Sequence, residues 1–206
     1  MTAGPERVWL VRHGETEGQS SIRYHGSNDV ALSDQGRAQI AALAPLLQGL
    51  DGATVVHSPL VRAAESARIL GATVGWPPAS LCADARLREI SFGDCEGMTE
   101  AEIAAAFPEF WAARQRGPVD AFPGGESRSA FAARVLAAIA DALANVRSRD
   151  LVVVAHRGTV RQALRAVLGV PPGARDPSPQ FGVRLGSLSV LRALPPWQVE
   201  LLDFVP

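Results

Sequence analysis

The segment VWLVRHGETEG, residues 8–18, decides how the chain folds, because an apolar run ends there abruptly in charged side chains. Val8–Val11 is apolar without alternation, which is typical of a strand covered on both faces in a parallel sheet. Arg12 and His13 follow this run directly, and Gly14 comes next. A cation and an imidazole at the end of a buried strand predict a functional edge of the sheet.

Two further runs, Thr54–His57 and Leu151–Ala155, have the same composition, and a helical pattern separates each run from the next. Strands that alternate with helices predict a three-layer α/β/α fold around a mostly parallel central sheet. Ser187–Leu191 and Gln198–Leu202, joined across Pro195-Pro196, are expected to add a strand pair at a sheet edge.

Capping residues, glycines and prolines predict where the helices begin and end. One alanine-rich helix places a single apolar stripe toward the core, formed by Phe131, Val135, Ile139, Leu143 and Val146. The expected helices run from Ser33 to about Gln48 with a kink or early stop at Pro45, from Ser58-Pro59 toward Gly71, from Ser127 to about Arg147, and from Gly158 to Leu168 before Gly169 and Pro171-Pro172.

Residues from about 97 to 125 differ in sequence pattern from the rest of the chain. Thr99 and Glu102 form a capping box that starts a short helix, and Pro108 interrupts it. We expect a small helical cap over the site, inserted into a single domain of 206 residues.

Charge and cysteine content restrict the class of protein. The net charge of −1 provides no positive field for binding nucleic acid or a membrane surface. Cys82 and Cys95 form no Cys-x-x-Cys pair and are expected to be free thiols in a reducing compartment. Because the N-terminus also lacks an apolar run long enough for a signal peptide or a membrane span, we predict a cytoplasmic protein.

Basic side chains from three distant segments are expected at the same sheet edge. Arg12 and His13 follow the first strand, Arg62 lies one turn into the helix after the second, and His156 follows the third. Each residue alone is more often structural than functional, but their common position after parallel strands favours a shared site. Cationic groups near helix N-termini suit a phosphoryl group.

The motifs that carry these residues resemble those of the histidine phosphatase (phosphoglycerate mutase-like) superfamily. The resemblance spans about Val8 to Gly169 and includes, in order, VRHGETEG, HSPLVRAAESARIL, LREISFGDCEGMT, PGGES and VVVAHRGTVRQALRAVLG. It implies an α/β fold with a mostly parallel sheet and a phosphohistidine mechanism.

The resemblance also implies roles for individual residues. His13 resembles the nucleophile and Glu89 the proton donor, while Arg12, Arg62 and His156 resemble the catalytic phosphate pocket. Further phosphate-binding candidates are Gly14, Gln19, Arg23 and Arg157. The arginines neutralise the substrate, and the sequence has no metal-ligand motif, so we expect no metal and no cofactor.

Several positions depart from the common pattern of the family. Gln19 stands where asparagine is frequent, so a direct phosphate contact from Gln19 is open. His25 replaces a glutamine and is either a substrate-shaping residue or a surface histidine. His57 either stabilises its strand end or touches the substrate, and Arg157 either reaches the pocket rim or faces solvent.

The expected function is that of a phosphomonoesterase, in which His13 forms the phosphohistidine and Glu89 donates the proton. The sequences EISFGDCEGMT and PGGES are more similar to the phosphatase branch than to the mutases. The alternatives are a cofactor-dependent phosphoglycerate mutase and a non-catalytic phospholigand-binding domain. The expected partner is a small phosphorylated metabolite, and the oligomeric state stays open, a homodimer included.

Overall fold

The computed structural model of the protein describes residues 4–19, 22–167, 169, 182–193 and 197–206. Within these residues one mixed sheet has six strands in the order β3-β2-β4-β1-β5-β6. The strands are β1 (Arg7–Arg12), β2 (Thr54–His57), β3 (Leu81–Ala83), β4 (Asp150–Ala155), β5 (Leu188–Arg192) and β6 (Gln198–Phe204). Neighbouring strands from β3 to β1 are parallel, while β5 is antiparallel to both β1 and β6, so the predicted fold class is confirmed.

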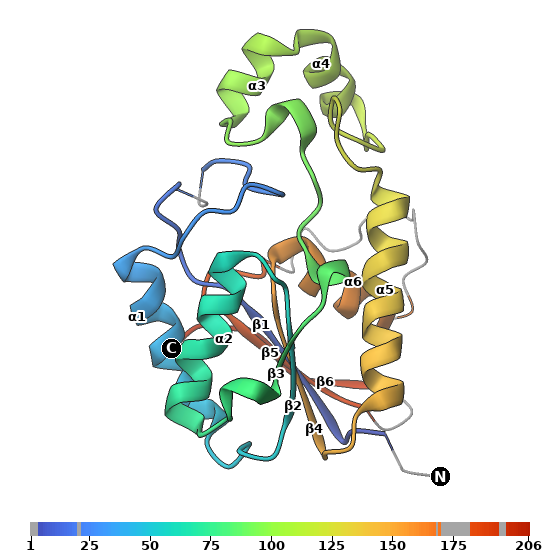
Figure 1. Ribbon diagram of the computed structural model, residues 1–206. Coiled ribbons are helices and arrows are strands. Elements are labelled where there is room, and N and C mark those ends of the chain that lie inside the picture. The colour runs from blue at the N-terminus through green and yellow to red at the C-terminus, as the bar shows by residue number, and fades with distance from the viewer. Residues whose placement is uncertain (1–3, 20–21, 168, 170–181, 194–196) are drawn as a thin grey trace.

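Helices cover both faces of the sheet (Figure 1). The α-helices are α1 (Asp34–Leu43), α2 (Val61–Val74), α3 (Glu100–Ala106), α4 (Pro108–Arg116), α5 (Arg128–Asn145) and α6 (Arg157–Val167). Short 3-10 turns are η1 (Ala44–Leu47), η2 (Pro78–Ser80), η3 (Ala85–Leu87) and η4 (Gly93–Cys95). Helices α1 and α2 lie on one face and α5 and α6 on the other, while α3 and α4 stand apart from the sheet near the start of α5 (Figure 1).

Alternate side chains of the inner strands pack into two separate hydrophobic clusters. In β1, Val11 packs in the cluster that contains residues of α1 and α2, whereas Val8 and Leu10 pack in the cluster that contains residues of α5 and α6. In β4, Val152 packs in the first of these clusters and Val153 in the second. A strand buried on both faces reads as a continuous apolar run, which is why the sequence identified β1, β2 and β4.

The predicted helix caps at Ser33, Thr99 and Ser127 are confirmed. The side chain of Ser33 accepts a hydrogen bond from Gly36, that of Ser127 accepts one from Ala130, and Thr99 forms a complete capping box. The expected early stop at Pro45 is also confirmed, because α1 ends at Leu43 and the chain continues as a 3-10 turn.

The predicted start of the second helix at Ser58-Pro59 is wrong. Helix α2 begins at Val61, and Leu60 before it has an extended ψ of 135°. The carboxylate of Asp29 accepts the hydrogen bond of the Val61 N–H at 2.6 Å, so a residue from another segment caps this helix. The helix also continues past Gly71 to Val74 and ends at Gly75, which has a positive φ of 95°.

One strand of the sheet, β3, has no counterpart among the sequence predictions. It has three residues, follows Pro77 and Pro78, and lies at an edge of the sheet. Such a short segment has no recognisable periodicity. Leu168, the Pro171-Pro172 pair and the Pro195-Pro196 turn lie outside the described residues, whereas the strand pair β5–β6 is confirmed as antiparallel.

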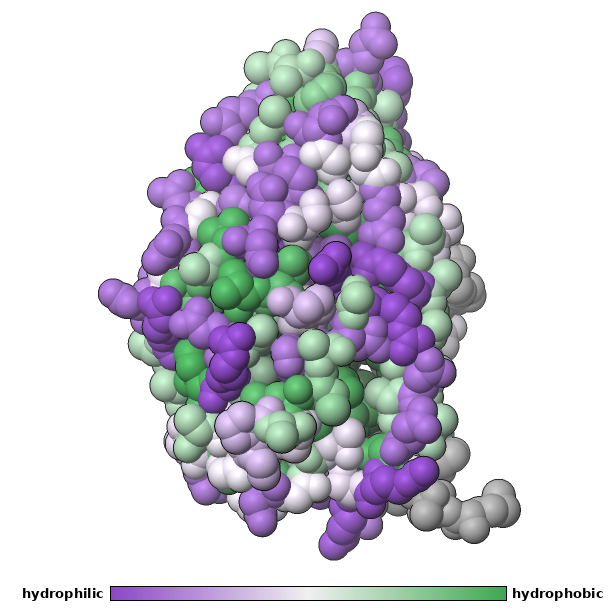
Figure 2. Space-filling model, in the orientation of Figure 1, coloured by the Kyte–Doolittle hydropathy of each residue, from purple (hydrophilic) through white to green (hydrophobic). Residues whose placement is uncertain are grey.

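In the stripe predicted for α5, Phe131, Val135 and Val146 are buried, and Ile139 and Leu143 pack against the cluster that contains residues of β1 and β4. Hydrophilic residues predominate where the outer side of α5 lies (Figure 2). Among the helices of the described residues, none has the length and apolar character to cross a membrane.

The loop after β1 is fixed by two glycines that face each other. A Cβ atom on Gly14 would lie 2.2 Å from the carbonyl oxygen of Gly36, and a Cβ atom on Gly36 would lie 2.0 Å from that of Glu15. Neither position has room for a side chain, so this close approach of α1 holds the segment that carries His13.

We expect Gly36→Ala to destabilise the protein by about 1–3 kcal/mol, because the added methyl group must displace the backbone at Glu15. Urea unfolding measures the loss of stability. Gly52→Ala is the matched control because a Cβ atom at Gly52 meets no atom within 4 Å. Equal stability of the two variants would contradict this account.

Candidate active site

Three side chains meet where parallel strands end at one edge of the sheet. His13 follows β1, His156 follows β4 and Ser58 follows β2. The ring centroids of His13 and His156 lie 5.1 Å apart, and His156 Nε2 lies 2.7 Å from the Ser58 hydroxyl. All three side chains are buried, with exposed fractions of at most 4%.

Hydrogen bonds fix the tautomer of His13. Its Nδ1 lies 2.7 Å from the carbonyl oxygen of Gly14, which can only accept, so Nδ1 carries the proton and donates it. The neutral ring therefore has an unprotonated Nε2, the nitrogen that can act as a nucleophile.

Arg62 lies at the centre of the cluster and is completely buried. Its Nε donates to His156 Nδ1 at 3.3 Å, which leaves the proton of His156 on Nε2, facing Ser58. The guanidinium also donates to the carbonyl oxygens of His25, Gly26 and Asn28 at 2.6–3.1 Å. The site therefore contains a buried cation held by neutral acceptors, an arrangement that leaves its positive charge available to an anion.

Burial and neighbouring cations lower the pKa of both histidines well below 6.5. For His13 the largest cause is desolvation, followed by the charges of Arg12 and Arg62. For His156 desolvation again comes first, followed by Arg62 and the neighbouring His13. Both imidazoles are therefore neutral at physiological pH, as a nucleophile and a neutral hydrogen-bond donor require.

Arg12, the last residue of β1, supplies a second cation. Burial lowers the pKa of Arg12 to about 10, so the side chain stays charged at neutral pH. Its Nη1 donates to the carbonyl oxygen of Val183 at 2.7 Å, while its buried Nε has no hydrogen-bond partner among the residues described. A buried donor without an acceptor is typical of a position that binds a ligand or water.

Glu89 reaches the cluster from the segment after β3. Its carboxylate accepts hydrogen bonds from the Gly158 N–H at 2.8 Å and from the Ile90 N–H at 3.0 Å. Gly158 belongs to the first turn of α6, which begins directly after His156. The side chain is 8% exposed, so Glu89 is fixed at the edge of the buried site.

Glu96 connects this site to the segment that leads to α3 and α4. Its carboxylate accepts hydrogen bonds at 2.8 Å from the N–H groups of Gly26, Ser27 and Phe92. The same loop provides the carbonyl acceptors of Arg62. The cap is therefore linked to the buried guanidinium through one short loop.

The structure brings Arg12, His13, Arg62, Glu89 and His156 together, but it does not do so for every candidate. Arg23 donates to the carbonyl oxygen of Gly97 and forms an ion pair with Glu102 at 2.8 Å, so its guanidinium is directed to the cap. Gln19 is exposed and has a positive φ of 58°. Arg157 is exposed at the start of α6, and its charge contributes to the lowered pKa of Arg12.

The two remaining histidines have structural contacts of their own. His57 Nδ1 donates to the carbonyl oxygen of Ser58 at 2.9 Å, which favours the first of the two alternatives, that His57 stabilises its strand end. His25 Nε2 contacts the carbonyl oxygen of Gly18, and the charge of His25 contributes to the lowered pKa of His13. His25 therefore lies close to the site, and its Nδ1 is buried without a partner among the described residues.

Ser58 is a site residue that the sequence analysis interpreted only as a helix cap. Its hydroxyl oxygen accepts hydrogen bonds from Nε2 of His156 at 2.7 Å and from the Leu60 N–H at 3.3 Å. Its position directly after β2 was the available signal, since His13 and His156 follow their strands in the same way. Among the described side chains, no group of three or more His, Cys, Asp or Glu is arranged to hold a metal ion.

The comparisons with known proteins agree with this geometry. The family model described as "Histidine phosphatase superfamily (branch 1)" matches residues 8–196. A glucosyl-3-phosphoglycerate phosphatase of Mycolicibacterium vanbaalenii is 37% identical over 172 residues, which cover 80% of this chain and 75% of that protein. A 2,3-bisphosphoglycerate-dependent phosphoglycerate mutase of Gloeobacter violaceus is 29% identical over 158 residues, which cover 75% of this chain and 72% of the mutase.

A solved structure of similar shape is that of a mycobacterial glucosyl-3-phosphoglycerate phosphatase in complex with VO3. It superimposes with a TM-score of 0.79 at 32% identity and covers 96% of this chain and 98% of that one. The chain belongs to the histidine phosphatase superfamily. The expected class, a phosphatase of this superfamily, is thereby confirmed.

The buried neutral histidines predict how stability depends on pH. Because the folded-state pKa of both His13 and His156 lies below 6.5, the unfolded chain binds more protons once the pH falls below that value. We expect each histidine to lower the free energy of unfolding by up to about 1.4 kcal/mol per pH unit below 6.5, with no contribution above it.

Urea unfolding between about pH 8 and about pH 5 measures this dependence, and His156→Asn isolates the share of one ring. The variant should lose stability less steeply with falling pH than the wild type, whatever its stability at about pH 8. Parallel curves for the two proteins would show that His156 is not held neutral by the fold.

Proposed function

We propose that the chain hydrolyses small phosphomonoesters, with His13 as the nucleophile and Glu89 as the proton donor. The observation that carries the proposal is the tautomer of His13, whose unprotonated Nε2 belongs to a buried cluster with Arg62 and His156. Attack on phosphorus needs a neutral nucleophile and a positive surrounding, and this cluster supplies both.

Substrate binding uses Arg12, Arg62 and His156. The guanidinium groups neutralise the phosphate dianion, and His156 adds a neutral N–H donor. Charge-assisted hydrogen bonds of this kind contribute about 1.5–3 kcal/mol each. Where negative charge builds up on the phosphoryl oxygens during transfer, these hydrogen bonds are stronger in the transition state than in the bound substrate. They then increase the rate more than they increase the affinity for substrate.

The reaction proceeds in two displacements. In the first, Nε2 of His13 forms a bond to phosphorus, the ester P–O bond breaks, and protonated Glu89 gives its proton to the leaving alkoxide. In the second, Glu89 takes a proton from water, the water oxygen bonds to phosphorus, and the N–P bond breaks. Enzyme and carboxyl group return to their first state.

The two alternative functions have less support. A mutase must return the phosphoryl group without losing it to water, and the mutase relative is less similar in sequence than the phosphatase relative. A domain that only binds phospholigands has no use for a carboxyl group held at the edge of the cationic cluster. Glu89 is held there by the Gly158 N–H, and its charge acts on Arg12 and Arg62.

The substrate is a small phosphorylated metabolite, and glucosyl-3-phosphoglycerate, on which the named relatives act, is the first candidate. A release assay for inorganic phosphate should compare this ester with 3-phosphoglycerate and α-ribazole phosphate. Isomerisation of 3-phosphoglycerate in the presence of 2,3-bisphosphoglycerate, without phosphate release, would favour the mutase. Independence from metals and cofactors and a cytoplasmic location stay predictions.

We expect His13→Ala to lower turnover by about 1,000-fold or more, because no other group can carry the phosphoryl intermediate. Wild-type protein quenched during turnover of a radiolabelled ester should retain an acid-labile, base-stable label, and the variant should not. Far-UV circular dichroism checks that the variant is folded. Label on the folded variant would assign the nucleophile to another residue.

Glu89→Gln should act selectively on esters with poor leaving groups. A sugar or glycerate alkoxide needs a proton as it leaves, whereas p-nitrophenolate does not. Loss of the general acid therefore slows the hydrolysis of sugar and glycerate esters only. In single turnovers we expect a fall of about 100-fold for the alkyl ester and less than about threefold for p-nitrophenyl phosphate. Equal losses for both esters would contradict the role of Glu89 as the acid.

A further inference from the structure

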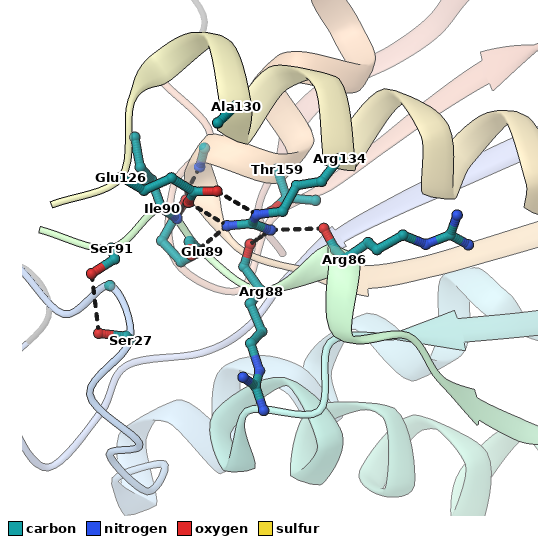
Figure 3. Close-up of polar contacts among 12 residues, drawn as sticks. Ser27, Arg86, Arg88, Glu89, Ile90, Ser91, Glu126, Ala130, Arg134 and Thr159 are labelled. Atoms are coloured by element: carbon teal, nitrogen blue, oxygen red, sulfur yellow. Dashed lines mark hydrogen bonds and ion pairs between the residues drawn. The ribbon is translucent and has the colours of Figure 1, made fainter. Parts of the chain in front are cut away.

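The segment that carries Glu89 is held by an arginine of helix α5. Arg134 donates from Nη1 to the carbonyl oxygens of Arg86 and Arg88, both at 2.8 Å, and from Nη2 to that of Glu89 at 3.0 Å (Figure 3). These residues follow β3 and belong to no strand, so no sheet partner is available for their backbone. One guanidinium therefore supplies the hydrogen bonds that a neighbouring strand would otherwise provide.

The remaining carbonyl of this stretch is bound from α6. The hydroxyl of Thr159 donates to the carbonyl oxygen of Leu87 at 3.2 Å. Four successive carbonyl groups, those of residues 86–89, thus accept hydrogen bonds from the side chains of two helices. The backbone of residues 86–89, which includes Glu89, is therefore held at every carbonyl group.

Glu126, in the PGGES motif, orients Arg134. Its carboxylate accepts from Nε of Arg134 at 2.7 Å and from Nη2 at 2.6 Å (Figure 3). With the three carbonyl groups, all five N–H donors of the guanidinium have an acceptor. The bidentate ion pair sets the plane of the guanidinium, and this plane directs the remaining donors to the segment that carries Glu89. The backbone N–H of Glu126 is itself fixed to the Ser91 carbonyl oxygen at 3.0 Å.

Phe131 connects the same guanidinium to the other side of Glu89. The centre of the Arg134 guanidinium lies 4.9 Å from the centroid of the Phe131 ring. A Cβ atom on Gly158 would lie 3.1 Å from Phe131 Cζ and 2.2 Å from Glu89 Oε1. The Phe131 ring and Gly158 therefore both lie against the Glu89 carboxylate, and no side chain fits at position 158 beside it.

We propose that Arg134, oriented by Glu126, is the positioning residue that sets Glu89 for proton transfer to the leaving group. The inference rests on the proposed role of Glu89 and assigns a task to a motif, PGGES, that the reaction itself does not use. Arg134 acts through the backbone of Glu89. A lysine cannot replace it, because a single ammonium group does not span three carbonyl oxygens and a carboxylate.

The test is the leaving-group preference of Arg134→Gln in single turnovers. We expect release of alcohol from a glycerate or sugar phosphate to slow by about 10- to 100-fold, and release of p-nitrophenol from p-nitrophenyl phosphate to slow by less than about threefold. Arg134→Lys should show the same preference. Glu126→Gln, which weakens the ion pair that orients Arg134 but leaves the guanidinium in place, should show the same preference at about three- to tenfold.

Arg37→Gln is the matched control, because Arg37 also binds two carboxylates, those of Glu65 and Asp34, at 2.7 and 3.0 Å. It makes no hydrogen bond to residues 86–89, so the ratio of the two rates should stay that of the wild type. A structural role of Arg134 would lower both rates by the same factor, and that result overturns the inference. If Glu89→Gln is selective and Arg134→Gln is not, the inference fails while the proposed function stands.

Discussion

Complete burial of the Arg62 guanidinium is the constraint on which the rest of the site depends. A buried charge must find hydrogen-bond acceptors within the protein, and Arg62 finds them in His156 and in the carbonyl groups of the loop from His25 to Asn28. That loop is bound in turn by the carboxylate of Glu96, which lies before the cap helices. One buried cation thereby connects the sheet edge, the loop from His25 to Asn28 and the segment before α3.

Burial also determines the protonation of the two histidines of the site. His13 and His156 are buried beside the guanidinium groups of Arg12 and Arg62. Burial and nearby positive charge both lower the pKa of an imidazole. Both rings are therefore neutral at neutral pH, which is the form that the proposed nucleophile, His13, requires. The same two causes underlie the expected loss of stability in acid, because removing either cation would raise the pKa of both histidines.

The sequence predicted the parts of the fold that local physics controls. The apolar runs of β1, β2 and β4, the caps at Ser33 and Ser127 and the stop at Pro45 each depend on residues within a few positions of one another. The prediction failed where a distant residue intervened. Asp29 caps α2 in place of Ser58, whose hydroxyl is bound to His156, and β3 is a strand only because β2 lies beside it.

The sequence by itself determined which residues of the site come after which strands, because parallel strands deliver their carboxyl ends to one edge whatever the details of packing. It thereby named Arg12, His13, Arg62 and His156 as neighbours, with Glu89 added by family resemblance. Only the tertiary structure decided the tautomer of His13, the contact of Arg62 with His156 and the support of Glu89 by Arg134. Those features are hydrogen bonds between segments far apart in the chain, and their geometry exists only once the helices have packed on the sheet.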